Sequence, residues 1–372
     1  MTPRTKATGG QRRDGAGQSG ASAQDEPAPT EFTFRKPSEI LGQTFSDSDK
    51  ILGERLLAEN QALTICGQGG IGKSRLVLQL AACQILLVDF IGMKTHGPPR
   101  KWLILQTENN NRRLQFDLAK LKQWAGGRWP EIDDKLLLHT LETDDDWLVN
   151  FERSESRIRA AISKYQPDIV VFDPLNAFTL GDLNADADML RVCLKLAEMV
   201  KQGNPKRALI VLHHALTGRA GASKATGYDR SSFNRNSKAL LNWTRAQINL
   251  APGSEDDNET LVVSCGKNSN GPEFKSFAVR MNRETMIYEP FRGFDFDGWK
   301  NAIAGKAKRK CTTEEIAELV SSEGDTKAGV ARKAEEKTGI SRATGNRIIS
   351  EAIRKELIRF DATAKKCFPV AK

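Results

Sequence analysis

The sequence contains no apolar run of about 18 residues, which is the length that a membrane-spanning helix needs. Its N-terminus has no apolar core of a secretory signal, so we expect no export by that route. No two of its six cysteines form a C-x-x-C pair. This spacing argues against a disulfide framework or a zinc site and favours reduced thiols in a cytoplasmic protein. The cysteines are Cys66, Cys83, Cys193, Cys265, Cys311 and Cys367.

The composition is that of a globular chain with very polar parts. Of its 372 residues, 39% are hydrophobic and 28% are charged, and the length predicts two or three domains. Residues 1–30 have almost no large apolar side chain, so we expect a disordered tail there. The net charge of +9 suggests a polyanionic partner, although basic charge alone more often affects solubility.

Residues 67–74 read GQGGIGKS and fit the pattern G-x-x-x-x-G-K-[ST]. They follow an apolar strand-like run and precede a segment with apolar residues at helical spacing, which is the context that a phosphate-binding loop requires. Bare glycine backbone can turn its N–H groups toward a phosphate, and the start of a helix adds a positive dipole. We therefore expect ATP and Mg²⁺ as cofactors. The candidate nucleotide-binding residues are Gly67, Gln68, Gly69, Gly70, Ile71, Gly72, Lys73 and Ser74.

Strand-like and helical segments alternate from residue 61 to about residue 290. Near-continuous apolar strands between helices predict an α/β fold with a mostly parallel sheet flanked by helices. The later strands follow one another without helices and predict an antiparallel extension. We expect strands at 62–66, 102–106, 136–140, 168–173, 208–213, 246–250, 260–265 and 274–280. We expect helices at 73–87, 111–124, 153–165, 186–202 and 233–245.

Three polar residues end strands of this predicted sheet. Asp173 follows the apolar run 169–172, so its carboxylate suits a role with Ser74 as a ligand of Mg²⁺, unless it only begins a turn. Glu108 could polarise the attacking water, or it could cap the helix 111–124. His214 could sense the γ-phosphate, although a histidine at a strand end is most often structural.

The ordered motifs carry a family resemblance. Residues 67–74, 106–108 followed by Arg112 and Arg113, 170–173 and 211–215 occur in the order seen in RecA-like ring ATPases. The chain resembles most the RepA type of plasmid replicative helicase and its wider AAA group. Residues 235–245 look like that family's R-G-S-S-x-x-x-x-x-x-R stretch, with Asn236 and Lys238 at its Gly and second Ser. Residues 266–271 look like its late S-K-x-N-x-G turn.

The resemblance spans about residues 50–290 and implies a RecA-like P-loop ATPase domain, which we expect over residues 31–295. It also implies a homo-oligomer, with six subunits in a ring and ATP bound between neighbours. Arg245 would reach into the adjacent subunit's site as an arginine finger, a role that suits its fixed fork of donors, and Lys267 would assist it. The alternative for Arg245 is an exposed cation at a helix end.

Residues 216–230 form a long basic loop without apolar periodicity. The resemblance implies that this loop faces a central channel and grips single-stranded DNA. Arg219, Lys224 and Arg230 would contact phosphates, and Tyr228 could stack on a base. The alternative is a basic surface loop with no ligand.

The last part of the chain predicts a second nucleic-acid site. Residues 296–311 predict a basic linker, and 312–372 predict three helices and a two-stranded ribbon, which is a winged helix-turn-helix domain. Thr312 with Glu315 predicts a capping box at the first helix, and Ser341 predicts the N-cap of the third. Arg342 and Arg347 would meet duplex DNA from the third helix. In residues 300–372, Lys and Arg outnumber Asp and Glu by 17 to 10. Winged helices also serve as protein-interaction modules, which is the alternative here.

These patterns together predict an ATP-hydrolysing DNA-binding protein. The favoured function is a RepA-type ring helicase or replication ATPase of a plasmid or mobile element. The alternative is a non-motor switch in which ATP controls assembly and the winged helix binds a specific duplex. A small-molecule kinase is disfavoured, because His213 and His214, the basic loop 216–230 and the predicted winged-helix domain would then have no role.

Overall fold

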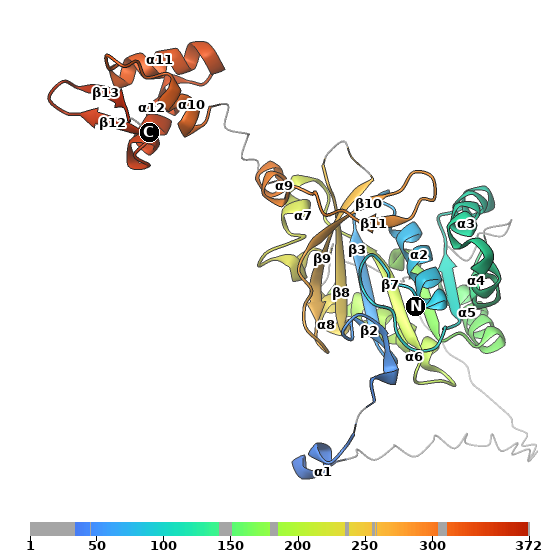
Figure 1. Cartoon of the computed structure of the whole chain (residues 1–372). Helices are drawn as coiled ribbons and strands as arrows, with labels where there is room; N and C mark the ends of the chain where they lie inside the picture. The colour runs from blue at the N-terminus through green and yellow to red at the C-terminus, as the bar shows by residue number, and fades with distance from the viewer. Residues whose placement is uncertain are drawn as a thin grey trace, which may run out of the picture. The chain divides into compact units, whose positions relative to one another are not determined.

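The segments expected to be strands pair into one nine-stranded sheet in the computed structural model (Figure 1). The pairs from β8 through β5 are parallel, and the pairs beyond β8 on the other side are antiparallel. All eight expected strands are present near the expected ranges, so the α/β fold class is confirmed. The order is β11 (Tyr288–Pro290), β10 (Phe277–Met281), β9 (Thr260–Asn268), β8 (Ala246–Pro252), β3 (Ala62–Gly67), β7 (Ala208–His214), β6 (Ile169–Asp173), β4 (Trp102–Gln106), β5 (Leu136–Leu138).

The structure describes residues 34–44, 46–140, 151–178, 185–234, 238–254, 257, 259–303 and 311–370, without the side chains of 151–153 and 219–220. The expected disordered tail at 1–30 lies outside the described residues. So do residues 304–310 of the expected linker and residues 235–237 of the stretch before Arg245.

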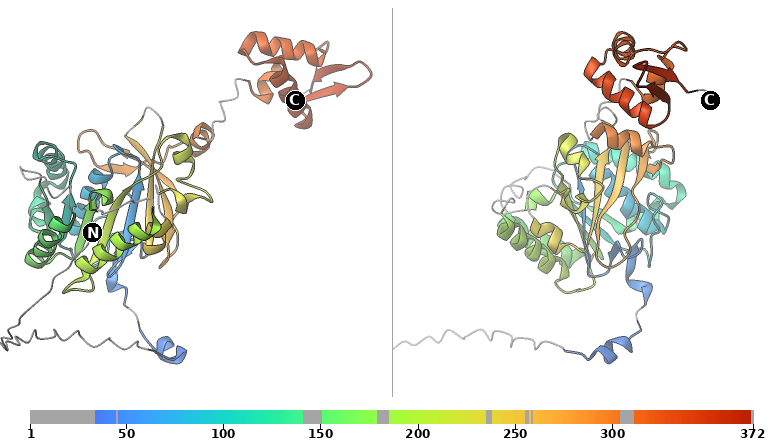
Figure 2. Two further views of the ribbon diagram at one scale, coloured as in Figure 1. Left: turned by 180° about the vertical axis from the view of Figure 1, so that it is seen from behind. Right: turned by 90° about the vertical axis from the view of Figure 1, so that its left-hand side faces the viewer.

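Helices cover both faces of the sheet (Figure 2). On one face, α2 (Lys73–Leu86), α3 (Asn111–Ala125) and α4 (Trp129–Lys135) pack on one set of strand side chains. On the other face, α5 (Phe151–Tyr165), α6 (Asp186–Lys201) and α8 (Lys238–Trp243) pack on the alternate set. Alternating residues of the strands therefore pack into two apolar layers, one on each face of the sheet, as expected for parallel strands buried on both sides.

Some elements differ from the expectation. The helix expected at 233–245 is described only as α8, and the expected loop 216–230 holds the short helix α7 (Gly218–Ser223) and the start of a 3₁₀ turn at Arg230–Ser232. The expected linker begins with α9 (Phe296–Ile303), because the indole of Trp299 is buried and donates to the Pro252 carbonyl at 2.9 Å. A linker from residue 296 was therefore wrong for its first eight residues.

Residues 311–370 have their own apolar cluster, formed by three helices and a two-stranded sheet. Thr312 and Ser341 cap the first and third helices as expected, and Thr312 forms a capping box with Glu315. The ribbon is tied to the start of the second helix by paired hydrogen bonds between Asp325 and Cys367, at 2.9 and 2.7 Å. The elements are α10 (Thr313–Glu318), α11 (Lys327–Thr338), α12 (Arg342–Arg354), β12 (Ile358–Asp361) and β13 (Lys366–Pro369).

Smaller features complete the description. Residues 34–44 contain α1 (Pro37–Leu41), a five-residue helix with no buried residue. Strands β1 (Lys50–Leu52) and β2 (Leu57–Ala58) form a separate antiparallel pair. The six cysteines are free and buried. Among the described helices, none combines the length and apolar character that crossing a membrane requires.

Candidate active site

The glycine-rich loop joins the end of β3 to the start of α2, as the sequence predicts. Its backbone favours glycine at two positions. A Cβ on Gly67 would lie 2.5 Å from the Ile71 Cδ1 atom. Gly72, the residue before α2, has a φ of 88°, which is unfavourable for any other residue. Such a loop presents the unsatisfied N–H groups of a helix start to an anion.

Lys73 folds back onto this loop. Its side chain is buried, and its Nζ atom donates to the carbonyls of Gly67 at 3.0 Å and Gln68 at 2.8 Å. Burial lowers the pKa of Lys73, and the negative charges of Asp173 and Glu108 oppose that effect. The ammonium thus lies at the inner side of the loop, where a phosphate oxygen would be a stronger partner than a neutral carbonyl.

Asp173 ends β6 on the same face of the sheet as α2. Its side chain is only 5% exposed, and burial raises its pKa to about 6 while a hydrogen bond with Ser74 acts in the opposite direction. A hydroxyl and a carboxylate in contact are the hard oxygen donors that Mg²⁺ accepts, and Mg²⁺ usually needs only one or two protein ligands beside phosphates and water. The pair fits that ion. No cluster of three His, Cys, Asp or Glu side chains suited to a metal exists among the residues the structure describes.

Glu108 lies two residues beyond the end of β4, and β4 is the neighbour of β6 in the sheet. The strand register pairs Gln106 with Asp173, so the turn that carries Glu108 begins level with Asp173. Glu108 is exposed, and its charge acts on both Lys73 and Asp173. The N-cap of α3 is Asn110, whose side chain accepts from the Arg113 N–H at 3.0 Å. The alternative role of Glu108 as that cap is therefore wrong.

The side chain of Gln106 shapes this turn, a role that the sequence did not predict. Its Nε2 donates to the carbonyls of Asn109 at 2.8 Å and His139 at 2.9 Å, and its Oε1 accepts from the Asn109 N–H at 2.7 Å. Gln106 is nearly inaccessible to solvent. The sequence offered one signal for this role, since Gln106 is a polar residue at the end of an apolar strand. Its hydrogen-bond partners, however, depend on how the turn folds.

The two histidines end β7, which separates β3 from β6 in the sheet. His214 pairs in register with Gly67, and a Cβ on Gly69 would lie 3.9 Å from the His214 Cε1 atom. His214 thus lies beside the loop. His213 is buried, and alternation along the strand directs it to the opposite face.

Arg245 and Lys267 lie at the edge of the sheet where the parallel strands begin, opposite the edge that carries the phosphate loop. The Arg245 N–H donates to the carbonyl of Ala62, at the start of β3, while the phosphate loop begins at the end of that strand. At about 3.3 Å per residue the two edges are roughly 17 Å apart. Arg245 is exposed, whereas the Lys267 Nζ donates to the carbonyls of Leu241 at 2.8 Å and Thr244 at 2.7 Å. The chain therefore does not bring either residue to its own loop.

The segment expected to contact single-stranded DNA is partly packed. Ser264 donates to the Ala225 carbonyl, and the Asn249 amide donates to the carbonyls of Ala225 at 3.1 Å and Arg230 at 2.7 Å. The Arg230 guanidinium pairs with Glu273. Tyr228 is fully exposed.

Lys224 caps the C-terminus of α7 and is half-buried, and the side chain of Arg219 lies outside the described atoms. A polar hollow of about 350 Å³ is lined by Tyr228, Arg230 and Lys267 among others. The segment predicted to bind DNA thus lines the same hollow as Lys267, which is predicted to assist at the ATP site of a neighbouring subunit.

In the C-terminal block, both expected DNA-binding arginines lie exposed on α12. The Arg342 Nε atom donates to a Glu335 carboxylate oxygen at 2.7 Å. Arg347 follows five residues, or about 1.4 turns, later, since an α-helix has 3.6 residues per turn. Only Arg342 has an ion pair among the contacts described.

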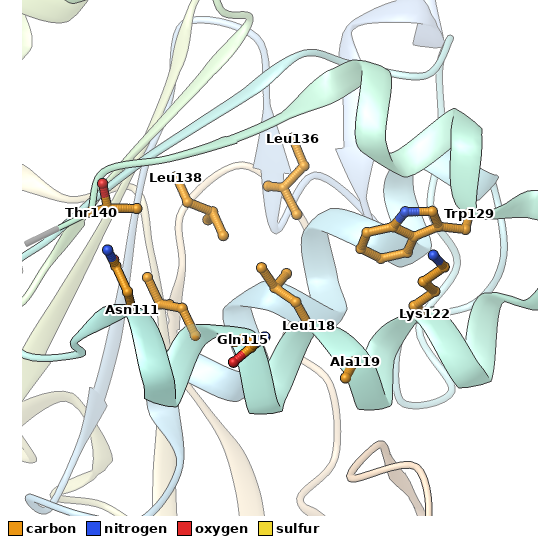
Figure 3. A pocket seen from close by; sticks show the side chains of 10 residues that line it. Asn111, Gln115, Leu118, Ala119, Lys122, Trp129, Leu136, Leu138 and Thr140 are labelled. Carbon is orange, nitrogen blue, oxygen red and sulfur yellow. The ribbon is translucent and has the colours of Figure 1, made fainter.

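A second hollow, of about 520 Å³, lies between α3, α4 and β5 (Figure 3). Leu118, Leu136, Leu138 and Trp129 line it with mostly apolar surface. None of its lining residues belongs to the phosphate loop, so it is separate from the site described above.

Comparison with known proteins identifies one family. The model of the AAA domain family matches residues 28–220. No curated protein matches the chain. Among solved structures, the chain is similar to a KaiC-like protein from the hyperthermophilic archaeon Pyrococcus horikoshii OT3. The two are 13% identical, with a TM-score of 0.43, over 63% of this chain and 91% of that one.

Proposed function

Since the chain belongs to the AAA domain family of P-loop ATPases, we propose that it hydrolyses ATP and couples this to work on DNA. The function we favour is that of a RepA-type ring helicase or replication ATPase of a plasmid or mobile element, and the order of the motifs along the sequence supports it. The observation that carries the ATPase proposal is the gathering of four elements at one sheet edge. These are the bare loop, the buried Lys73, the Ser74–Asp173 pair and Glu108.

Each of these residues has a distinct task in the proposed reaction. The loop N–H groups and Lys73 hold the β- and γ-phosphates, and Ser74 with Asp173 would hold Mg²⁺, which neutralises phosphate charge. Glu108 orients the water that attacks the γ-phosphorus and accepts its proton. Glu108 is exposed, so it can reach a water outside the loop. The position of His214 beside Gly69 supports a role in responding to the γ-phosphate.

We assign Arg245 and Lys267 to the site of a neighbouring subunit. Their position at the edge opposite the loop supports this assignment, because a role in the same subunit would need a movement of roughly 17 Å. An arginine offers a planar fork of donors to the oxygens of a transferring phosphoryl group. The proposal requires an assembly in which one subunit's β8 edge meets the next subunit's loop, as in a ring of six.

DNA would be contacted at two places. The exposed Tyr228 ring, with Arg230 and Lys224 nearby in sequence, supports stacking and phosphate contacts along a single strand. Exposed Arg342 and Arg347 on α12 support a recognition helix in a winged-helix domain over residues 312–372, following a shortened linker.

A second candidate is an ATP-dependent switch without motor activity, and one observation favours it. Residues 311–370 form a separate core with capped helices, so this block could bind a specific duplex by itself. The two candidates differ in their DNA dependence. ATP turnover stimulated by single-stranded DNA, together with strand displacement, supports the motor. Stimulation only by one particular duplex sequence supports the switch.

The oligomer is tested by light scattering with and without ATP and Mg²⁺. The proposal predicts a mass of several subunits when both are present. A monomer under all conditions would contradict the assignment of Arg245, because no neighbour would then supply a site.

A further inference from the structure

The tyrosine of β11 lies against the phosphate loop of the same chain, although 217 residues separate Tyr288 from Ile71. Tyr288 is 2% exposed. The side chain of Gln79 in α2 forms hydrogen bonds with both backbone groups of Tyr288. Its Nε2 donates to the Tyr288 carbonyl at 2.8 Å, and its Oε1 accepts from the Tyr288 N–H at 2.8 Å. This pair of hydrogen bonds sets the position of β11 over the first turns of α2.

The hydroxyl of Tyr288 contacts the part of the loop where the chain turns into the helix. Its Oη atom donates to the Ile71 carbonyl at 3.4 Å, which is a long hydrogen bond. A Cβ on Gly72 would lie 2.2 Å from the same oxygen and 3.4 Å from the ring carbon that bears it. The hydroxyl therefore occupies the space directly beside Gly72, the residue with a φ of 88°.

A chain of polar contacts continues from this hydroxyl to the next helix. Arg75, in the first turn of α2, is near enough to the Tyr288 hydroxyl for its charge to lower the pKa of Tyr288 against the larger effect of burial. Its guanidinium donates to the Asp117 carboxylate at 3.0 Å. Asp117 belongs to α3, the helix that follows the turn with Glu108, and it also accepts from Arg113 at 3.0 Å. The hydroxyl thus donates to the loop and lies near a guanidinium that Asp117 holds in place.

We propose that Tyr288 is a positioning residue for ATP, which holds the Ile71–Gly72 turn so that the loop N–H groups converge on the phosphates. It contacts no reacting atom and acts through the loop backbone. This inference rests on the proposed ATPase function. A loop already held in its binding shape loses less conformational freedom when ATP binds, so the residue strengthens nucleotide binding more than it accelerates the chemical step.

The test replaces only the hydroxyl, with Tyr288→Phe, and measures Kd for a fluorescent ATP analogue together with KM and kcat for ATP. Because this hydrogen bond is long, its loss corresponds to the lower part of the usual range, a change of about threefold in Kd and KM. We expect kcat to stay within about twofold. Tyr165→Phe is the matched control, since this half-buried tyrosine ends α5, with its ring under the Lys164 ammonium at 4.9 Å.

A merely structural role gives a different pattern. It would lower the unfolding temperature of Tyr288→Phe while leaving Kd, measured well below that temperature, equal to the control. That result would overturn the inference. Absence of ATP binding by the wild-type protein would instead refute the proposed function, so the two failures are distinguishable.

A second variant probes the same contact from the loop. Gly72→Ala places its methyl group 2.2 Å from the Tyr288 hydroxyl oxygen and should weaken ATP binding by more than Tyr288→Phe does. In the double variant Gly72→Ala/Tyr288→Phe the clash with oxygen is absent, so ATP should bind more tightly than to Gly72→Ala alone. Equal or weaker binding by the double variant would contradict the contact, because the backbone strain at a φ of 88° is the same in both.

Discussion

Replacing Glu108 with glutamine should stop ATP turnover without preventing ATP binding. Gln keeps the size of the side chain and removes its ability to accept a proton. Loss of a general base typically lowers kcat by about 10²–10⁴-fold. The effect on the fold should be small, because Glu108 is exposed and does not cap α3.

The structure also indicates how ATP affinity should change. The Glu108 charge raises the pKa of Asp173, after the larger effect of burial, and it opposes the effect of burial on Lys73. Removing that charge leaves both groups in place and takes one negative charge away from the phosphate site. We therefore expect Kd for ATP in Glu108→Gln to be unchanged or slightly tighter.

The assay measures phosphate release at saturating ATP beside calorimetric ATP binding. Glu284→Gln serves as the control, since this carboxylate is exposed on the turn between β10 and β11. Turnover within threefold of wild type would refute the assignment of Glu108 as the water-orienting residue. Loss of ATP binding together with turnover would show that Glu108 instead supports the loop.

Three further predictions concern other parts of the chain. Mixing Arg245→Ala subunits with Glu108→Gln subunits should restore turnover that each lacks alone, because an intact site forms between unlike neighbours; no gain on mixing would refute action across subunits. Arg347→Ala should weaken duplex binding and reduce the slope of log affinity against log salt by about 1, and an unchanged slope would exclude a phosphate contact. Lys333 and other donors hold the pKa of Asp325 below its usual value, so the ionised carboxylate stabilises the folded state. This stabilisation is complete above the pKa of Asp325 in the unfolded chain and is lost as pH falls through its lower pKa in the folded chain. Asp325→Asn should lower the free energy of unfolding by about 1–2 kcal/mol at pH 7, and the difference from wild type should shrink as pH falls through the lowered folded pKa; a pH-independent difference would contradict the sign.

Local patterns predicted much of the fold. The apolar runs of β3 and β6 and the glycine spacing of residues 67–74 are properties of short segments, and these segments are present near their expected ranges. Asp173 and Glu108 were predicted from their places at strand ends, because parallel strands end at one edge of the sheet. The caps at Thr312 and Ser341 were likewise local and are confirmed.

Contacts between distant segments could not be predicted in this way. Nothing near Tyr288 in the sequence indicates that its hydroxyl touches Ile71, since that contact depends on how β11 packs over α2. The partners of Gln106 depend on where β5 places His139. The helix around Trp299 was missed because basic residues nearby suggested a linker, whereas burial of one indole decides the structure there.

Calorimetric titration of the wild-type protein and Lys73→Ala with ATP in Mg²⁺ tests the central claim most directly. The account predicts saturable binding by the wild-type chain, weaker binding when Mg²⁺ is chelated, and no measurable binding by Lys73→Ala. Absence of affinity for any purine triphosphate in folded wild-type protein would contradict it, and so would equal binding by the two proteins.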